Sequence, residues 1–512
     1  MGVHQPFRCH FKPSFRLLVF LLALVWTLPL KAALIQVLHT NDLHSHMHHA
    51  TDPQKGGFVA VQAVMQRLRS QARASNIPVL TFDAGDFSEG GRLFFGNGGY
   101  HSFDALNAMG YNAVTVGNHD YLMGPQRFNE LLGLTRFAFP MLAANLHCQG
   151  LSHFRDHVKP FASFTVGEGA TRVRIAVLGL TTDDTNYTWR MKSNCQFEDP
   201  IKAAKTWIPI MRRNHDFVIA LTHIGLYADL DLIRKTQGID LVIGGHSHTA
   251  LFFPEGARNT QGQLVPIVQA GMHGEYVGEL LIDGYPGSPL QVLKYQLNAV
   301  SSRDGLNDSS LNHVREKVEQ AQLGLEQTYG KQWLEYPIGF SEVVLKSPMS
   351  ESTEWGDFMA EAMRQAGQAE IAFDVARFHG LDQSAGIIRR LNLLTAYPRQ
   401  FEADRRMGWT VWAATVPGHF IIANMTDLIK KGINFSVAGL KVETEYDSRS
   451  RGYVFKQAYY RNQPLSFFKE YRMAMPEGLV RGGYESQRVL AQAVMLNPVD
   501  TRIPIWLAIE RH

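Results

Sequence analysis

Short runs of aliphatic residues alternate with longer amphipathic stretches in the N-terminal half of the chain. The runs that we expect to form strands are 34–38, 79–82, 113–116, 217–221 and 241–243. Several of them are apolar throughout, as is typical of strands that are covered on both faces. The segments 58–72 and 103–109 between them have the spacing of amphipathic helices. This alternation predicts an α/β fold.

Further patterns divide the rest of the chain. The runs 173–180, 265–269 and 276–282 are expected to build a second sheet packed on the first. A helical pattern over 311–329 follows a polar stretch and is interpreted as a connector. A chain of 512 residues is too long to fold around a single hydrophobic core. We therefore expect a larger domain over residues 33–300, a linker with a helix over 301–335, and a smaller α/β domain over 336–512.

The N-terminus has the pattern of a secretory signal. Arg8, Lys12 and Arg16 precede an apolar run from Leu17 to Leu30, which is shorter than the roughly 18 residues of a membrane span. We expect residues 1–32 to be a signal peptide, and the mature protein to be periplasmic or secreted with no stable membrane span. An uncleaved anchor is the alternative.

Net charge and cysteine content say little about the function. The formal net charge is only +3, so nothing indicates a nucleic acid as partner. Cys9 lies in the expected signal, which leaves Cys148 and Cys195 for the mature chain. An oxidising compartment permits a disulfide between them, and two inert thiols are the alternative. Oligomeric state is not indicated by the sequence.

Polar motifs follow the apolar runs, at the strand ends where α/β sheets place their binding loops. They are Asp42-Leu43-His44, Gly85-Asp86-Phe87-Ser88-Glu89-Gly90, Gly117-Asn118-His119-Asp120, Thr222-His223 and Gly244-Gly245-His246-Ser247-His248. Imidazole nitrogens and carboxylate or amide oxygens without a thiolate suit two divalent ions such as Zn, Mn or Fe. One carboxylate can bridge two such ions, and Asp86 is our candidate. His46, His48 and His49 are expected to be loop residues.

In order and spacing, these motifs resemble the calcineurin-like metallophosphoesterase superfamily. With Ala144-Asn145-Leu146, they most resemble its secreted 5′-nucleotidase branch, strongly over residues 34–282 and weakly towards the C-terminus. The resemblance implies a four-layer αββα domain followed by a smaller 5′-nucleotidase-type α/β domain. It also implies two metal sites that share Asp86. The first would be formed by Asp42, His44, Asp86 and His248, and the second by Asp86, Asn118, His223 and His246.

The same resemblance implies that His119 is catalytic rather than a ligand. It would stabilise charge on the phosphoryl group or protonate the leaving oxygen, while a hydroxide activated by the two metals attacks phosphorus. The 5′-nucleotidases usually carry an Asp three residues after this histidine, which orients it. Leu122 occupies that position here, and Asp120 is the adjacent carboxylate. We therefore assign Asp120 to the catalytic group, while the residue that orients His119 stays open.

The C-terminal region resembles the family's substrate domain but departs from it at the nucleotide-reading residues. Asp374-Val375-Ala376-Arg377-Phe378-His379-Gly380 stands where the family has Asn-Gly-Gly-Gly-Ile-Arg, and Gly478 stands where it has Phe. Our substrate candidates are aromatic residues for stacking and an arginine for phosphate. They are Tyr397, Phe401, Tyr484 and Arg377.

The resemblance implies hydrolysis of phosphate monoesters, with nucleoside 5′-monophosphates or related nucleotides as expected substrates. The departures in the C-terminal region leave another small-molecule ester open at the same metal site: a cyclic nucleotide, a nucleotide sugar, a non-nucleotide phosphate or a sulfur ester. A non-catalytic, metal-binding surface protein is the remaining alternative. Such a protein would be expected to have lost a ligand or His119, and all of these residues are present.

Overall fold

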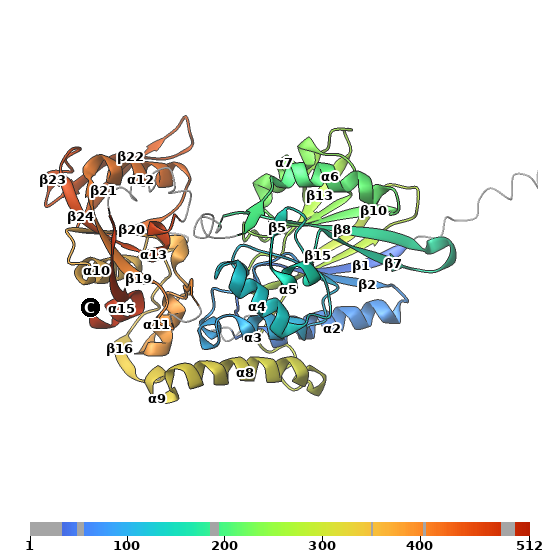
Figure 1. Ribbon diagram of the computed structural model, residues 1–512, viewed down its shortest axis with the longest axis horizontal. Helices are drawn as coiled ribbons and strands as arrows, with labels where there is room; N and C mark the ends of the chain where they lie inside the picture. The colour runs from blue at the N-terminus through green and yellow to red at the C-terminus, as the bar shows by residue number, and fades with distance from the viewer. Residues whose placement is uncertain (1–32, 49–55, 185–193, 350–351, 403–405, 483–496) are drawn as a thin grey trace, which may run out of the picture.

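The computed structural model describes residues 33–48, 56–184, 194–349, 352–402, 406–482 and 497–512. The expected signal peptide and Tyr484 lie outside these residues. Figure 1 shows two lobes, an N-terminal one in blue to green and a C-terminal one in orange to red, with a long helix beneath them.

The first sheet of the N-terminal lobe has seven strands. Their order is β15 (Gln291–Ala299), β14 (Tyr276–Asp283), β1 (Leu34–Thr40), β2 (Val79–Asp83), β3 (Ala113–Thr115), β4 (Met141–Leu142) and β6 (Val158–Lys159). The strands from β1 to β6 are parallel, with Leu38 opposite Thr81, whereas β14 and β15 are antiparallel to their neighbours. The expectation that residues 276–282 belong to the second sheet is wrong, because β14 pairs with β1.

The second sheet has six strands and packs against the first. Their order is β12 (Glu255–Arg258), β13 (Leu264–Val268), β11 (Leu241–Ile243), β10 (Phe217–His223), β8 (Val173–Thr181) and β7 (Phe161–Val166). Side chains from both sheets, among them Ile35, Val37 and Phe217, form one buried cluster. This inner layer explains why the strands are apolar on both faces.

Helices cover the two outer faces. Leu38, on the opposite face of β1, belongs to the core that includes α2 (Phe58–Ala74), α3 (Tyr100–Asn107) and α4 (Pro125–Thr135). The helices α6 (Pro200–Arg212) and α7 (Leu226–Lys235) contribute to a separate core with the second sheet. The predicted four-layer αββα arrangement is therefore confirmed.

The long helix beneath the lobes is α8 (Asn312–Tyr329), which is followed by α9 (Lys331–Leu334). Its apolar positions Val314, Val318, Ala321 and Leu325 are buried, as the sequence pattern predicts. They pack against α3 and the 3₁₀ helix η2 (Arg92–Gly96). This packing attaches the connector to the N-terminal lobe.

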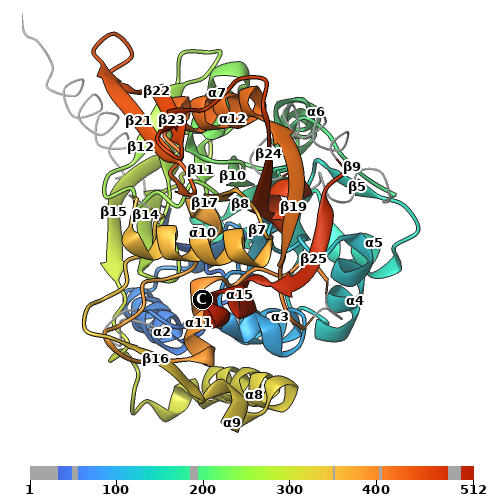
Figure 2. The same cartoon turned by 90° about the vertical axis from the view of Figure 1, so that its left-hand side faces the viewer.

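The C-terminal lobe is built on a five-stranded sheet. Its order is β20 (Phe435–Ala438), β17 (Ile371–Val375), β24 (Glu470–Pro476), β19 (Thr410–Pro417) and β25 (Val499–Pro504). Figure 2 shows this lobe facing the viewer, with α10 in front. Its helices are α10 (Glu354–Ala366), α11 (Arg390–Ala396), α12 (Gly418–Lys430), α13 (Glu477–Val480) and α15 (Ile505–Arg511). The predicted smaller α/β fold is confirmed.

Smaller sheets complete the structure. They pair β5 (Leu146–Cys148) with β9 (Cys195–Phe197), β16 (Pro337–Ser341) with β18 (Gly386–Arg389), and β21 (Lys441–Asp447) with β22 (Gly452–Tyr460) and β23 (Gln463–Pro464). A disulfide joins Cys148 to Cys195 across the first of these pairs. Within the described residues, every helix is too short or too polar to cross a membrane.

Candidate metal centre

The polar motifs of the sequence meet at one edge of the two packed sheets. Asp42 and Asp86 follow the parallel strands β1 and β2, and Asn118 follows β3. His223 ends β10 of the second sheet, and His246 and His248 follow β11. Because parallel strands direct their carboxyl ends to the same edge, residues from five loops can face a common point.

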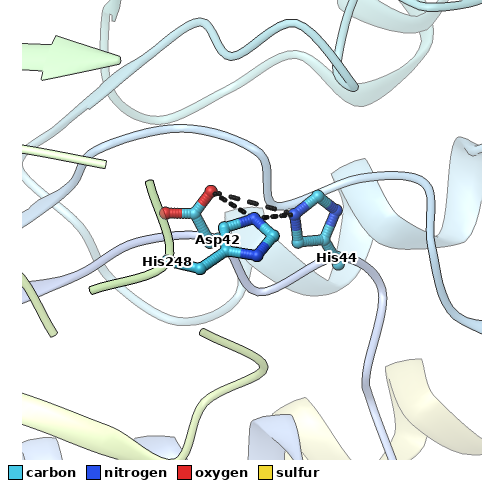
Figure 3. Close-up of side chains that lie close together, drawn as sticks. All are labelled: Asp42, His44 and His248. Carbon is cyan, nitrogen blue, oxygen red and sulfur yellow. Dashed lines mark hydrogen bonds and ion pairs between the residues drawn. The ribbon is translucent and has the colours of Figure 1, made fainter. Parts of the chain in front are cut away.

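One group of candidate ligands consists of Asp42, His44 and His248, whose ligand atoms lie within 4.8 Å of one another. Figure 3 shows the three side chains pointing toward one another. Nε2 of His248 lies 3.3 Å from Oδ1 of Asp42 and 3.1 Å from Nε2 of His44. Two ring nitrogens and a carboxylate oxygen around one point are a donor set that suits a divalent transition ion.

A second group consists of Asp86, His223 and His246, and Asn118 lies between its imidazoles. Oδ1 of Asn118 is 3.2 Å from Nε2 of His223 and 3.0 Å from Nδ1 of His246. Oδ2 of Asp86 is 3.0 Å from Nε2 of His223 and 3.7 Å from Nε2 of His44. Asp86 thus contacts both groups, as a bridging carboxylate would.

Hydrogen bonds to the far side of the rings set which nitrogen faces the centre. His44 places Nδ1 2.8 Å from the carbonyl oxygen of Glu89, and His223 places Nδ1 2.6 Å from that of Ala84. A carbonyl accepts only from N–H, so Nδ1 carries the proton and Nε2 is the nitrogen available to a metal. Nε2 of His246 lies 2.8 Å from the carboxylate of Asp184, which leaves Nδ1 toward Asn118.

The buried acids and histidines of the site shift one another's pKa values. Burial alone would raise the pKa of Asp86, but His223 and His119 beside it hold that pKa well below its usual range. Burial opposes charge on His223 as well, yet Asp86 and Asp42 raise its pKa to about 10. Burial lowers the pKa of His44 well below its ordinary value. Buried anions at this density are the environment that a cation neutralises.

The backbone at the centre is also unusual. Asp42, His44, Asp86, His246 and His248 all have left-handed backbone conformations, with φ between 47° and 74°. Such values are uncommon for residues other than glycine and concentrate at functional sites. Five strained candidate ligands in one centre indicate that side-chain placement outweighs local backbone preference here.

His119 lies beside the first group. Its ring meets that of His44 edge to face, with centroids 4.7 Å apart, and its side chain keeps 20% exposure. Nδ1 lies 2.6 Å from Oε2 of Glu89. Glu89 is fully buried and belongs to the glycine-flanked motif after β2, but its residue type alone did not indicate a role. The sequence feature that could have identified Glu89 is its position as an acidic residue in a loop flanked by glycines.

Asp120 is hydrogen-bonded within the loops that follow β2 and β3. Its carboxylate accepts hydrogen bonds from the backbone N–H groups of Asp86, Ser88 and Gly117. These bonds join the loops after β2 and β3 and hold Asp86 in place. Both carboxylate oxygens of Asp120 thus accept from backbone amides, and its assignment to the catalytic group stays a prediction.

The candidate substrate residues are scattered over the C-terminal lobe. Arg377 is exposed in the 3₁₀ helix η6 (Ala376–Phe378). Tyr397 is buried with its hydroxyl 3.2 Å from Asp374. Phe401 is buried, stacked on Trp409 with centroids 4.7 Å apart and contacted by Arg481. Neither of these two rings presents an open face for stacking in this structure.

Four layers of α/β structure with such a donor set at the strand ends define the class of metal-dependent phosphoesterases. Residues 35–250 match the model of the calcineurin-like phosphoesterase family, so this part of the chain is a calcineurin-like phosphoesterase domain. Calcineurin-like phosphoesterases use divalent metals, and the candidate ligand groups fit that requirement.

Curated relatives include 5′-nucleotidases. The chain is 30% identical over 270 residues to the 5′-nucleotidase of Bos taurus, which covers 49% of this chain and 46% of the relative. It is 26% identical over 384 residues to the trifunctional nucleotide phosphoesterase protein YfkN of Bacillus subtilis, covering 69% of this chain and 25% of the relative. The chain thus spans less than half the length of these relatives.

Solved structures match both lobes. The 5′-nucleotidase precursor of Thermus thermophilus superposes with a TM-score of 0.78 at 22% identity, covering 93% of this chain and 96% of that one. The sulfate thiohydrolase SoxB of the same organism superposes with a TM-score of 0.71 at 16% identity, covering 95% of both chains. At these identities the likeness concerns the fold.

Proposed function

We propose that the protein is a hydrolase of phosphate monoesters, with nucleoside 5′-monophosphates or related nucleotides as substrates. The observation that carries this proposal is the contact of Asp86 with both candidate ligand groups, beside His119. Two cations held by a shared carboxylate, next to a proton donor, suit in-line displacement at phosphorus. The 5′-nucleotidase relatives support the nucleotide part of the proposal.

Two divalent ions, Zn, Mn or similar, are the proposed cofactors. Asp42, His44, Asp86 and His248 would hold the first, and Asp86, Asn118, His223 and His246 the second. When bound, they supply Lewis acidity toward phosphoryl oxygens and acidify water. The buried charge pairs and the tautomers of His44 and His223 fit this role.

The protein's own contribution to the chemistry centres on His119. Glu89 accepts the Nδ1 proton, so Nε2 is the ring atom that would donate to the leaving oxygen or to the phosphoryl group. The edge-to-face contact with His44 places the ring at the first ligand group. A general acid in this position contributes about 10²–10⁴-fold to the rate.

Export to the periplasm or the extracellular space is part of the proposal. The disulfide between Cys148 and Cys195 supports it, because such bonds persist in oxidising compartments. The signal-like segment that motivates it lies outside the described residues.

A second candidate keeps the metal centre and changes the ester. Burial of Tyr397 and Phe401 favours it, since these rings are not open for base stacking. A cyclic nucleotide, a nucleotide sugar, a non-nucleotide phosphate or a sulfur ester would then be the substrate. A non-catalytic metal-binding role is the least supported, because every candidate ligand and His119 are present in the chain.

A substrate panel tests the proposal. Mature protein loaded with Mn or Zn is assayed on AMP, a cyclic nucleotide, a UDP-sugar, an aryl phosphate and a thiosulfonate ester. We expect the highest kcat/KM with AMP, loss of activity on chelation and recovery with added metal. Asp86→Asn should abolish turnover, whereas Asp231→Asn, in an exposed ion pair of α7, should not.

The outcomes separate the candidates. Preference for the aryl phosphate rejects the nucleotide claim and leaves the phosphoesterase chemistry in place, whereas preference for the thiosulfonate ester rejects both. Metal-loaded protein that hydrolyses none of the esters rejects both catalytic candidates.

A further inference from the structure

We infer that Glu89 is the positioning residue of His119 and that Arg399 of the C-terminal lobe holds Glu89 in that position. This inference rests on the proposed function, because it assigns roles relative to a catalytic His119.

The position that usually supports this histidine is occupied by an apolar residue. Leu122 is buried in the core that also contains Tyr121 and Phe128. Asp120, the adjacent acid, uses both oxygens on backbone amides. The carboxylate that contacts the ring of His119 in the described structure comes instead from the loop after β2.

The contact with Glu89 has the geometry of a strong hydrogen bond. Nδ1 of His119 and Oε2 of Glu89 are 2.6 Å apart, and the side chain of Glu89 has no solvent exposure. A charge-assisted bond to a buried carboxylate fixes both the orientation and the tautomer of an imidazole. Glu89 is therefore placed to keep Nε2 of His119 directed to the leaving oxygen or the phosphoryl group.

Glu89 is itself immobilised by its own backbone. Its carbonyl oxygen accepts from Nδ1 of His44 at 2.8 Å, and its φ of 41° is left-handed. Gly90 follows with a φ of +123°, and a Cβ there would lie 2.9 Å from Cβ of His44. One residue thus connects a metal-ligand candidate through its backbone with His119 through its side chain.

A buried carboxylate needs a countercharge, and the C-terminal lobe provides it. Nη1 of Arg399 lies 2.8 Å from the same Oε2 that contacts His119. The backbone N–H of Gln400 points at Oε1 from 3.4 Å. Because burying a carboxylate without a partner is strongly unfavourable, the contact with Arg399 stabilises Glu89 in this position.

Arg399 is held on its other sides by the segment that carries Arg377. Nε donates to the carbonyl oxygen of Phe378 and Nη2 to that of Arg377, each at 2.9 Å. All three edges of the guanidinium are therefore used. The contacts that hold His119 thus extend from the loop after β2 to η6, so residues of both lobes together position the catalytic ring.

The test compares Glu89→Gln and Arg399→Gln with the wild type in the presence of Mn. The matched control is Glu130→Gln, an exposed acid paired with Arg127. We expect both variants to lower kcat about 10–100-fold, as for other residues that orient a functional group. KM and bound metal should change less than twofold, and the control should match the wild type.

A double-variant cycle separates positioning from general destabilisation. If Glu89 acts through His119, adding Glu89→Gln to His119→Ala lowers kcat no further. A further loss in the double variant, or an unchanged kcat in Glu89→Gln, would overturn the inference.

A spectroscopic measurement keeps the inference testable apart from the proposed function. In ¹⁵N-histidine-labelled protein, the Nδ1–H signal of His119 is assigned as the one that His119→Ala lacks. This signal should be present in the wild type and lost or strongly shifted in Glu89→Gln and Arg399→Gln. An unchanged signal would reject the contact. Wild type that hydrolyses no ester, together with the expected shift, would reject the proposed function and retain the positioning.

Discussion

Gly117 lies directly against Asp86, the acid that contacts both ligand groups. A Cβ at Gly117 would stand 2.1 Å from Oδ1 and 2.3 Å from the backbone nitrogen of Asp86. The φ of Gly117 is not left-handed, so the need for glycine here is one of space. The absence of a side chain at this position is what allows the loops after β2 and β3 to meet.

Gly117→Ala should therefore displace Asp86 and weaken metal binding. We expect at least about a tenfold loss of affinity, in the range typical of lost support for a ligand, with turnover falling in parallel. Metal titration and elemental analysis measure the effect. Gly339→Ala, where a Cβ meets no atom within 4 Å, is the control. Equal metal content in the two variants would contradict the steric argument.

His119→Ala should retain bound metal and lose turnover. The expected decrease in kcat is about 10²–10⁴-fold, because a positioned proton donor is removed while the ligand atoms stay. Steady-state kinetics with elemental analysis separates the two effects. His147→Ala changes an exposed histidine and should behave as the wild type. Unchanged turnover in His119→Ala would refute the assigned role.

Removing the disulfide should destabilise the N-terminal lobe. Cys148 and Cys195 are separated by 47 positions, and closing a loop of this length stabilises a fold by about 2–4 kcal/mol. The double variant with both cysteines changed to serine should unfold at lower urea concentration. The wild type under reducing conditions should shift toward it. Coincident unfolding curves with and without reductant would exclude a stabilising bond.

His39 should make stability depend on acid. It is fully buried beside Gly278, and burial lowers its pKa from 6.5 to about 3. The unfolded chain therefore binds a proton that the folded one excludes, so this stability contribution is complete above pH 6.5 and is lost as pH falls toward 3. His39→Phe should show a shallower loss over that window in urea unfolding. Parallel pH profiles of the two proteins would contradict this.

Much of the fold follows from local pattern. Expected strands such as 241–243 coincide with the structure, because an apolar run bounded by a polar motif marks a buried strand and its end. The pattern predicts residues 276–282 in the second sheet, but they lie in the first. The partner of β14 is β1, far away in sequence, and no local property of either run specifies that pairing.

The candidate site also combines residues that local sequence indicates with residues whose roles depend on distant contacts. Asp42, Asp86 and His223 could be selected by residue type at strand ends, and the structure brings them together. Leu122 marked a missing carboxylate, but not its replacement. Glu89 is identified by its contact with His119, 30 positions away, and its ion pair with Arg399 spans 310 positions. Burial of Tyr397 and Phe401 likewise depends on tertiary packing that composition does not reveal.

The left-handed backbone at five candidate ligands links the metal supply to the lifetime of the protein. At roughly 1–2 kcal/mol for each residue, these conformations cost the folded chain several kcal/mol, which cation binding can offset. A bound cation stabilises only the folded chain, in proportion to the logarithm of its concentration. Metal scarcity would therefore lower not only turnover but the amount of protein that survives proteolysis.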